Sequence, residues 1–311
     1  MKKILLIIGL FLFIPSLCWS QGRISRPKKK EPIKKEAPKQ TPKTQKSNSH
    51  KERSSETNSK PDHNQVQKQS TLLNSTETIN GITVKWASDV TSSQKSAITT
   101  LLNNMIYVQG GSFMMGSNES DAFDFEKPVH KETVSSFRID KYEVTQKLWQ
   151  AVMGNNPSHF KGENLPVEKV SWNDCQDFIK KLNLLTGLSF RMPTEAEWEY
   201  AARGGNLSKG YQYSGSNTIG NVAWYEGNSG SKTHPVGTKS PNELGLYDMS
   251  GNVWEWTSDS YSSNYNSRRN RWDYVYRGGN WVNNARLARV AYRSYHEATR
   301  RNSNLGFRLV L

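Results

Sequence analysis

The chain has 311 residues and carries 42 Lys and Arg against 28 Asp and Glu, a formal net charge of +14. Residues 21–70 hold 14 basic and 5 acidic residues, so most of the excess lies in one segment and does not indicate a nucleic-acid-binding domain. No segment beyond the N-terminal one is apolar for long enough to cross a membrane.

Residues 1–20 have the pattern of a secretory signal peptide. Lys2 and Lys3 precede an apolar run over residues 4–14, and the small residue Ser20 ends the segment. The alternative is a lipoprotein with Cys18 lipidated, which is disfavoured because Leu17 stands where a small residue is usual. We expect an exported protein that is periplasmic, on the cell surface or secreted.

Residues 21–80 are expected to form a basic disordered tether. Lys, Pro, Ser, Gln, Asn and Thr dominate, and too few large apolar side chains are present to offset the conformational entropy of folding. Such a segment can touch anionic surfaces, or it can act as a solvated spacer. The interleaving of Pro and Ser/Thr with the charges favours the spacer.

Residues 81–104 are predicted to be an accessory strand and helix packed on a main domain that begins at residue 105. Residues 82–86 alternate as in a strand, and Thr91 with Gln94 forms a capping-box pattern for the helix. Within the main domain, residues 105–108 predict a strand and residues 110–116 a glycine-punctuated hairpin.

Three further helices are predicted after the N-cap residues Thr145, Ser171 and Thr194. Cys175 falls at core spacing in the second of these and has no basic neighbour, so we expect a buried, unreactive thiol. Beyond residue 204 the composition favours irregular loops held by aromatic packing, with short strands at residues 275–277 and 307–310.

Three long motifs occur in the folded part: RMPTEAEWEYAARGG at residues 191–205, GNVWEW at 251–256 and RGGNW at 277–281. Together with NLGFR at 304–308, they make residues 105–311 similar to the formylglycine-generating enzyme family, also called sulfatase-modifying factors. The resemblance implies an α+β, formylglycine-generating-enzyme-like fold with C-type-lectin-like topology and low regular secondary structure.

Active members of the family place two copper-binding cysteines after the Gly-Gly of the last motif. Counting from Gly278 and Gly279, those positions hold Asn283 and Ala288, which offer no thiolate for copper(I). The resemblance therefore implies a pseudoenzyme, without copper and without oxidation of cysteine to formylglycine. No catalytic residue is assigned.

Calcium is the cofactor that the resemblance suggests. One site would use side-chain oxygens at both ends of a glycine-containing turn and carbonyl oxygens between them, which suits a hard cation. Its residues are Asp248, Gly251, Val253 and Glu255. A second site, weakened because Asn228 replaces a carboxylate, would map onto Asn221, Val222, Asn228 and Gly230.

The C-terminal segment is the candidate ligand-binding face, because the resemblance places it along the cleft and such faces favour Tyr, Asn and Arg. The candidates are Asn280, Trp281, Asn283, Asn284, Arg289, Tyr292, Arg293 and His296. The alternative is that the arginines pair with carboxylates and hold the loops in place.

We therefore expect a non-catalytic binding or scaffold module of the cell envelope, with a protein, glycan or peptide as partner and no nucleic acid. One alternative is a lectin-like glycan or peptide binder. Another is a non-haem metal oxidoreductase distinct from the copper enzymes, although His130, His159, His234 and His296 show no paired metal-binding spacing.

Overall fold

The computed structural model describes residues 73–311, which lie within a single compact unit of the chain. The predicted signal segment, Cys18 and residues 21–72 of the predicted tether lie outside this range. No helix between residues 73 and 311 is long and apolar enough to span a bilayer.

The described part begins with an antiparallel hairpin of β1 (Leu73–Ile79) and β2 (Ile82–Ala87). The predicted tether is therefore wrong for residues 73–79. Asn80 and Gly81 both have positive φ, which is the two-residue hairpin turn that an Asn-Gly pair favours. The sequence of β1 is mostly polar and therefore resembles the predicted tether that precedes it, although the Asn-Gly pair indicates a hairpin.

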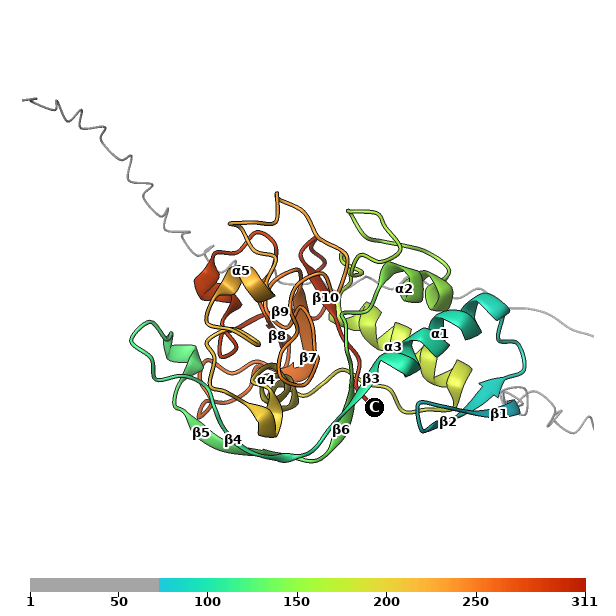
Figure 1. Ribbon diagram of the computed structural model, residues 1–311, viewed down its shortest axis with the longest axis horizontal. Helices are drawn as coiled ribbons and strands as arrows, with labels where there is room; N and C mark the ends of the chain where they lie inside the picture. The colour runs from blue at the N-terminus through green and yellow to red at the C-terminus, as the bar shows by residue number, and fades with distance from the viewer. Residues whose placement is uncertain (1–72) are drawn as a thin grey trace, which may run out of the picture. The chain divides into compact units, whose positions relative to one another are not determined.

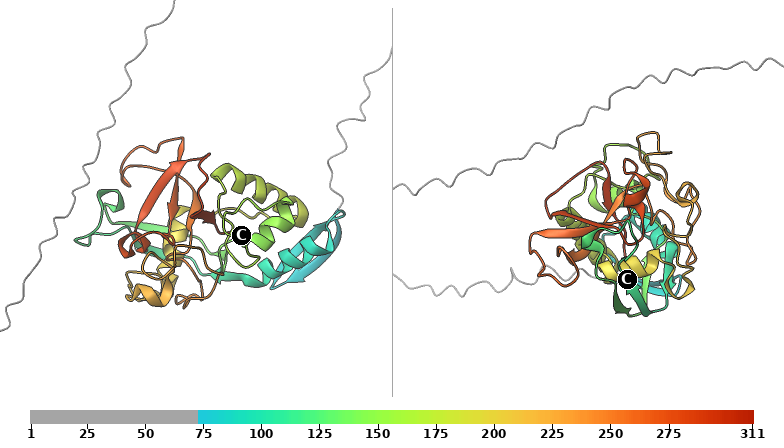
Figure 2. Two further views of the ribbon diagram at one scale, coloured as in Figure 1. Left: turned by 90° about the horizontal axis from the view of Figure 1, so that it is seen from above. Right: turned by 90° about the vertical axis from the view of Figure 1, so that its left-hand side faces the viewer.

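Helices α1 (Ser92–Asn104), α2 (Gln146–Met153) and α3 (Trp172–Thr186) begin where the sequence predicts. Thr91 and Ser171 form capping boxes, and α2 and α3 end at glycines in the left-handed conformation. Trp149 stacks on Phe178 at 5.1 Å, and both contact Phe307 edge-on. The three helices lie side by side (Figures 1 and 2) and share one hydrophobic core with β2.

A long two-stranded ribbon replaces the predicted hairpin at residues 110–116. Strand β3 (Met105–Val108) pairs with β6 (Phe137–Asp140), and β4 (Gly111–Met115) pairs with β5 (His130–Val134). The hairpin prediction was wrong because the partner of β4 lies beyond an intervening loop that contains the short helix η2 (Asp124–Glu126). Helix α4 (Glu195–Ala202), capped by Thr194 as predicted, packs its fully buried Trp198 in a second core with residues of this ribbon.

The central sheet has the strand order β10-β7-β8-β9. Its strands are β7 (Trp254–Ser260), β8 (Asp273–Arg277), β9 (Arg293–Glu297) and β10 (Leu305–Phe307). Strand β10 runs parallel to β7 and the other neighbours are antiparallel. Between α4 and β7 the only helices in the described chain are the short η3 (Gly205–Leu207) and α5 (Ile219–Val222). This agrees with the irregular loops predicted beyond residue 204.

Candidate functional site

The two positions that carry copper ligands in active relatives lie on the segment that joins β8 to β9. Asn283 accepts a hydrogen bond from Glu226 N at 3.0 Å through its carbonyl, and its side-chain oxygen is buried without a partner among residues 73–311. Ala288 is fully buried at the end of the short helix η4 (Ala285–Ala288). An amide and a methyl group therefore stand where thiolates would be needed.

Both arginines of the predicted ligand-binding face make buried ion pairs. Arg289 makes a bidentate ion pair with Glu126, with N–O distances of 2.8 and 2.9 Å. Arg293 makes one with Glu195, with both distances 2.6 Å. Arg289 is 3% and Arg293 1% exposed, and both guanidinium groups hold loops of the fold together through these ion pairs. These ion pairs match the alternative in which the arginines pair with carboxylates, and the ligand-binding assignment of the two residues stays a prediction.

Asn280, Trp281 and Asn284 shape the same segment. Asn280 is fully buried and accepts a hydrogen bond from Val282 N, and Trp281 donates from Nε1 to Ser303 O. Asn284 caps η4 through Arg286 N. The indole N–H of Trp281 and the side-chain oxygens of Asn280 and Asn284 are thus used within the fold, whereas Asn280 Nδ2 is buried without a partner among residues 73–311.

Tyr292 and His296, the two remaining candidates, are both half-buried, whereas Asn284 is exposed. The half-buried ring of Tyr292 lies edge-on to Phe123 and Phe125 at 5.5 and 5.6 Å, and burial raises the pKa of its hydroxyl to about 12. His296 Nδ1 accepts a hydrogen bond from Glu297 N. The eight candidates thus range from fully buried to exposed, with Asn280, Arg289 and Arg293 buried and Asn284 exposed.

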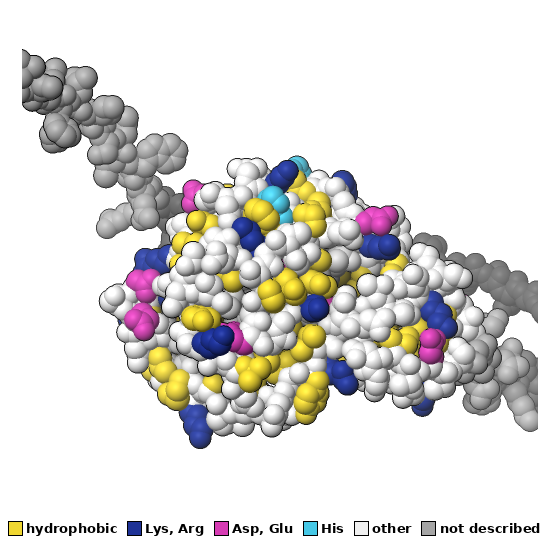
Figure 3. All heavy atoms as spheres, viewed as in Figure 1, with side chains coloured by type: hydrophobic (Ala, Val, Ile, Leu, Met, Phe, Trp, Pro, Cys, Tyr) yellow, Lys and Arg dark blue, Asp and Glu magenta, His cyan; other side chains and the backbone are white. Residues whose placement is uncertain are grey.

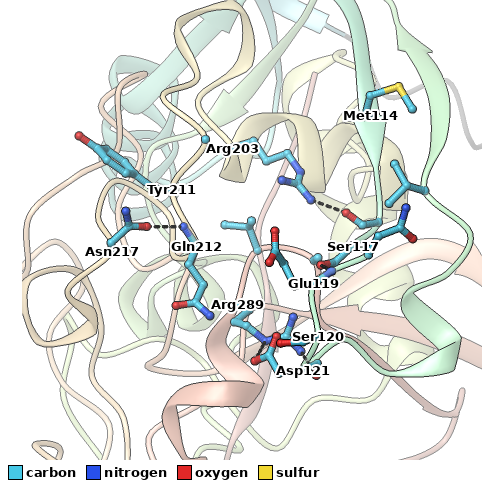
Figure 4. Close-up of a pocket in the computed structure, with 16 residues that line it drawn as sticks. Met114, Ser117, Glu119, Ser120, Asp121, Arg203, Tyr211, Gln212, Asn217 and Arg289 are labelled. Carbon is cyan, nitrogen blue, oxygen red and sulfur yellow. Dashed lines mark hydrogen bonds and ion pairs between the residues drawn. The ribbon is translucent and has the colours of Figure 1, made fainter.

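The sequence did not reveal a polar cavity of about 670 Å³. It lies between the loops at residues 116–121 and 210–217 and the segment 289–291, with Arg203 from the end of α4 at one side (Figure 4). Arg289 is the one member of the predicted ligand face among its lining residues. No local pattern predicts this cavity, because its walls come from segments far apart in the chain.

The first predicted calcium turn carries buried carboxylates. Asp248 is 2% exposed, its Oδ2 accepts a hydrogen bond from Gly237 N at 2.7 Å, and its Oδ1 has no partner in the described part. Burial raises the pKa of Asp248 to about 6. Both oxygens of Glu255 are held by Arg308, at 2.6 and 2.7 Å. Asp248 is therefore available to a cation, whereas Glu255 already has a counter-ion.

Glu143, which the sequence analysis did not include, lies beside this turn. It is 1% exposed and accepts hydrogen bonds from Asn252 Nδ2 and Val253 N. Burial, followed by the charge of Asp248, raises the pKa of Glu143 well above its usual value. Among residues 73–311, however, no three His, Cys, Asp or Glu side chains converge in a metal-binding arrangement. A cation here would depend on carbonyl oxygens as well.

The second predicted calcium site is a locally hydrogen-bonded loop. Asn228 Oδ1 accepts from Tyr225 N and its Nδ2 donates to Ala223 O, both at 2.9 Å. The carbonyl of Asn221 accepts from Ser240 N, and Val222 is buried. Gly230 has a positive φ, and a Cβ added there would meet nothing within 4 Å. The amide of Asn228 closes the turn itself.

Fold and site together define a formylglycine-generating-enzyme-like protein without the cysteine pair. A family model described as the sulfatase-modifying factor enzyme 1-like domain matches residues 90–311, and the chain belongs to this family. The predicted fold class is thereby confirmed. The match begins before residue 105 and includes α1, so this helix belongs to the family domain and is not accessory to it.

Chaperone protein LppX of Paenibacillus barcinonensis is 35% identical over 265 residues, which cover 69% of this chain and 91% of that protein. Inactive C-alpha-formylglycine-generating enzyme 2 of Bos taurus is 28% identical, covering 66% of this chain and 87% of that protein. Among solved structures, Treponema denticola variable protein 1 superposes with a TM-score of 0.61 and 32% identity, over 76% of this chain and 98% of that chain.

Proposed function

We propose that this protein is a non-catalytic binding module that acts on a partner protein of the cell envelope. The observation that carries the proposal is the absence of copper-binding side chains at positions 283 and 288. Asn283 and Ala288 supply no thiolate there, and the one cysteine of the family domain, Cys175, is fully buried in α3. Soft thiolates are what retain copper(I), so the reactive centre of active relatives has no ligands here.

Two relatives support a binding role. One is named a chaperone protein and another an inactive formylglycine-generating enzyme, and both align over most of their own length. The buried Arg289–Glu126 and Arg293–Glu195 pairs support it as well, because they fix the loops around the former catalytic segment. A rigid surface loses less entropy on binding a partner than a mobile one.

The proposed setting is the cell envelope. The N-terminal pattern predicts export, and the basic segment that follows would let the domain reach a partner while it touches anionic surfaces. On the face shown in Figure 3, charged side chains of both signs are scattered and do not form a field of one sign. That distribution favours protein recognition over nucleic-acid binding.

Capture of envelope proteins by the full chain tests this function, with recovery of a discrete partner as the expected result. A second assay incubates the protein with copper and a thiol-bearing peptide under air. We expect no aldehyde product.

The double variant Asn283→Cys/Ala288→Cys is the matched control for this assay, since it restores sulfur ligands to the same backbone. Aldehyde formation by the unaltered chain would refute the proposal.

We also propose that the turn containing Asp248, Gly251, Val253 and Glu255 binds calcium. Asp140, Glu143, Asp248 and Glu255 are each at most 4% exposed, and their charges act on one another and on Arg308, which makes its ion pair with Glu255 alone among them. Such an excess of buried negative charge is costly unless it is protonated or neutralised by a cation. The free Oδ1 of Asp248 is the donor that a hard cation would use first.

A further inference from the structure

The walls of the polar cavity are held in place by buried ion pairs and backbone contacts. Arg203 bonds Glu199 Oε1 through both Nε and Nη2, and its Nη2 also donates to Gly116 O at 2.8 Å. Arg289 is fixed by Glu126. On the opposite loop, Gln212 N donates to Asn217 Oδ1 at 2.8 Å. The shape of the cavity therefore exists before any ligand arrives.

Other groups in the same cavity have unused hydrogen-bonding capacity. Within residues 73–311, the Glu119 carboxylate, the Gln212 side-chain amide and Arg203 Nη1 make no hydrogen bond. Figure 4 shows Glu119, Gln212 and Arg203 around the same space, each from a different segment. Glu119 and Gln212 are exposed and have no evident structural role. A cavity whose walls are fixed by hydrogen bonds, and which also presents a few polar groups without partners, is typical of a ligand-binding site.

The chemistry of these groups selects the class of ligand. A carboxylate, an amide and a guanidinium edge offer acceptors and donors together, which suits hydroxyl groups because each hydroxyl both donates and accepts. Glu119 would repel an anionic ligand, and Arg203 would repel a cationic one. Apolar side chains form only a small part of the lining, at positions such as Met114, Val290 and Ala291. A volume of about 670 Å³ lies within the range of small-molecule sites.

We propose that this cavity binds a neutral oligosaccharide of about two or three sugar units. The proposal does not depend on partner-protein binding, since Glu119, Gln212 and Arg203 take no part in the argument for that function. The exposed hydroxyls would pair with Glu119, Gln212 and Arg203, while Arg289 and Glu199 keep the walls in register.

The test is titration of the full chain with a panel of neutral trisaccharides: maltotriose, cellotriose, mannotriose and triacetylchitotriose. Binding is followed by saturation-transfer NMR and calorimetry, and trialanine is included as a peptide probe. We expect at least one sugar to bind in the millimolar range or tighter. The double variant Glu119→Ala/Gln212→Ala should weaken that binding by roughly tenfold or more.

The matched control is Glu163→Ala/Gln150→Ala, which removes the same side-chain types from exposed positions away from the cavity. It should leave sugar binding unchanged. Because Glu119 and Gln212 make no side-chain hydrogen bonds in the described chain, their loss should not unfold the protein, which circular dichroism will verify. The proposal is overturned if no sugar binds, if both double variants bind equally well, or if trialanine alone binds in a Glu119- and Gln212-dependent way.

Discussion

Arg308 and Glu255 form a bidentate ion pair that ties the C-terminal segment to strand β7. Arg308 Nε lies 2.7 Å from Glu255 Oε2, and Nη2 lies 2.6 Å from Oε1. Arg308 is fully buried and Glu255 is 1% exposed. Glu255 also accepts a hydrogen bond from Trp198 Nε1 at 2.7 Å, so β7, α4 and the chain end meet at one carboxylate.

Replacing Glu255 with Gln should therefore destabilise the protein strongly. The variant removes the carboxylate charge that accepts two hydrogen bonds from the Arg308 guanidinium, and breaking such a buried pair typically costs about 3–5 kcal/mol. We expect the free energy of unfolding, measured by urea denaturation, to fall by this amount.

An exposed pair of the same geometry provides the control. Arg301 contacts Asp174 through two N–O distances of 2.6 Å, but the side chains are 52% and 26% exposed. Arg301→Gln should cost less than about 1 kcal/mol, because water screens the pair. If Glu255→Gln proved no more costly than Arg301→Gln, burial of the Arg308–Glu255 pair would not be what fixes the chain end.

Local signals explain what the sequence could predict of the fold. Thr145, Ser171 and Thr194 each cap the helix that follows, and each acts through a backbone N–H within three residues of itself. Cys175 likewise falls on the buried face of α3 by helical spacing alone. Such features depend on neighbours in the chain, which the sequence displays directly.

Contacts between residues far apart in the chain explain which parts of the fold and the site the sequence could not predict. Met105 pairs with Asp140 across the ribbon, and nothing near residue 105 indicates that partner. The same holds for the arginines of the C-terminal segment, since the partner of Arg289 is Glu126, 163 residues away. An arginine in a loop offers a ligand-binding group or a structural ion pair, and the carboxylate that decides between them is invisible in sequence.

Stability should depend on pH through Asp140. Burial raises the pKa of this carboxyl from 3.8 to about 7, so the folded state holds a proton that the unfolded state has lost between about pH 4 and 7. Its contribution to the unfolding free energy therefore decreases as pH rises through this window. The stability difference between the native chain and Asp140→Asn should shrink or reverse from pH 4 to 7, by a few kcal/mol in urea titrations with chelator present.

Asp174 gives a comparison of opposite sign. Burial acts there in the same direction, but hydrogen bonds from Arg301 and Ser171 outweigh it and lower the pKa. Its contribution is present above the unfolded pKa and is lost as pH falls, so Asp174→Asn should cost less at low pH than at neutral pH. A pH-independent difference for Asp140→Asn would contradict the assignment of a protonated carboxyl.

Calcium should raise the melting temperature if the Asp248 turn binds it. A ligand that binds only the folded state at a hundredfold excess over its Kd stabilises by about 2.7 kcal/mol, or roughly 5–10 °C for a domain of this size. Scanning calorimetry with calcium and with chelator measures the shift. Asp248→Asn should abolish it, while Asn228→Ala should retain it if the first site is the one occupied. An identical melting temperature in calcium and chelator would remove the proposal.

The thiol of Cys175 should be inert in the folded protein. The residue is fully buried in α3, and burial raises its pKa well above the usual value, which disfavours the reactive thiolate. In a Cys18→Ser chain, where Cys175 is the sole cysteine, a disulfide reagent should label no thiol under native conditions and one thiol in denaturant. Rapid labelling of the native chain would place this helix face in contact with solvent.

Gly251 should tolerate no side chain, because the backbone of a neighbouring loop occupies the space. Its φ is 89°, and a Cβ there would lie 2.4 Å from Trp224 O. Gly245 has a similar φ of 82° but nothing within 4 Å of its would-be Cβ. Gly245→Ala should therefore cost only the left-handed strain of about 1–2 kcal/mol, and Gly251→Ala roughly 3 kcal/mol or more, as measured by urea denaturation. Equal losses would mean that the Trp224 loop moves aside freely. A larger loss at Gly251 would instead show that the backbone at Trp224 packs against this turn and does not yield to a side chain.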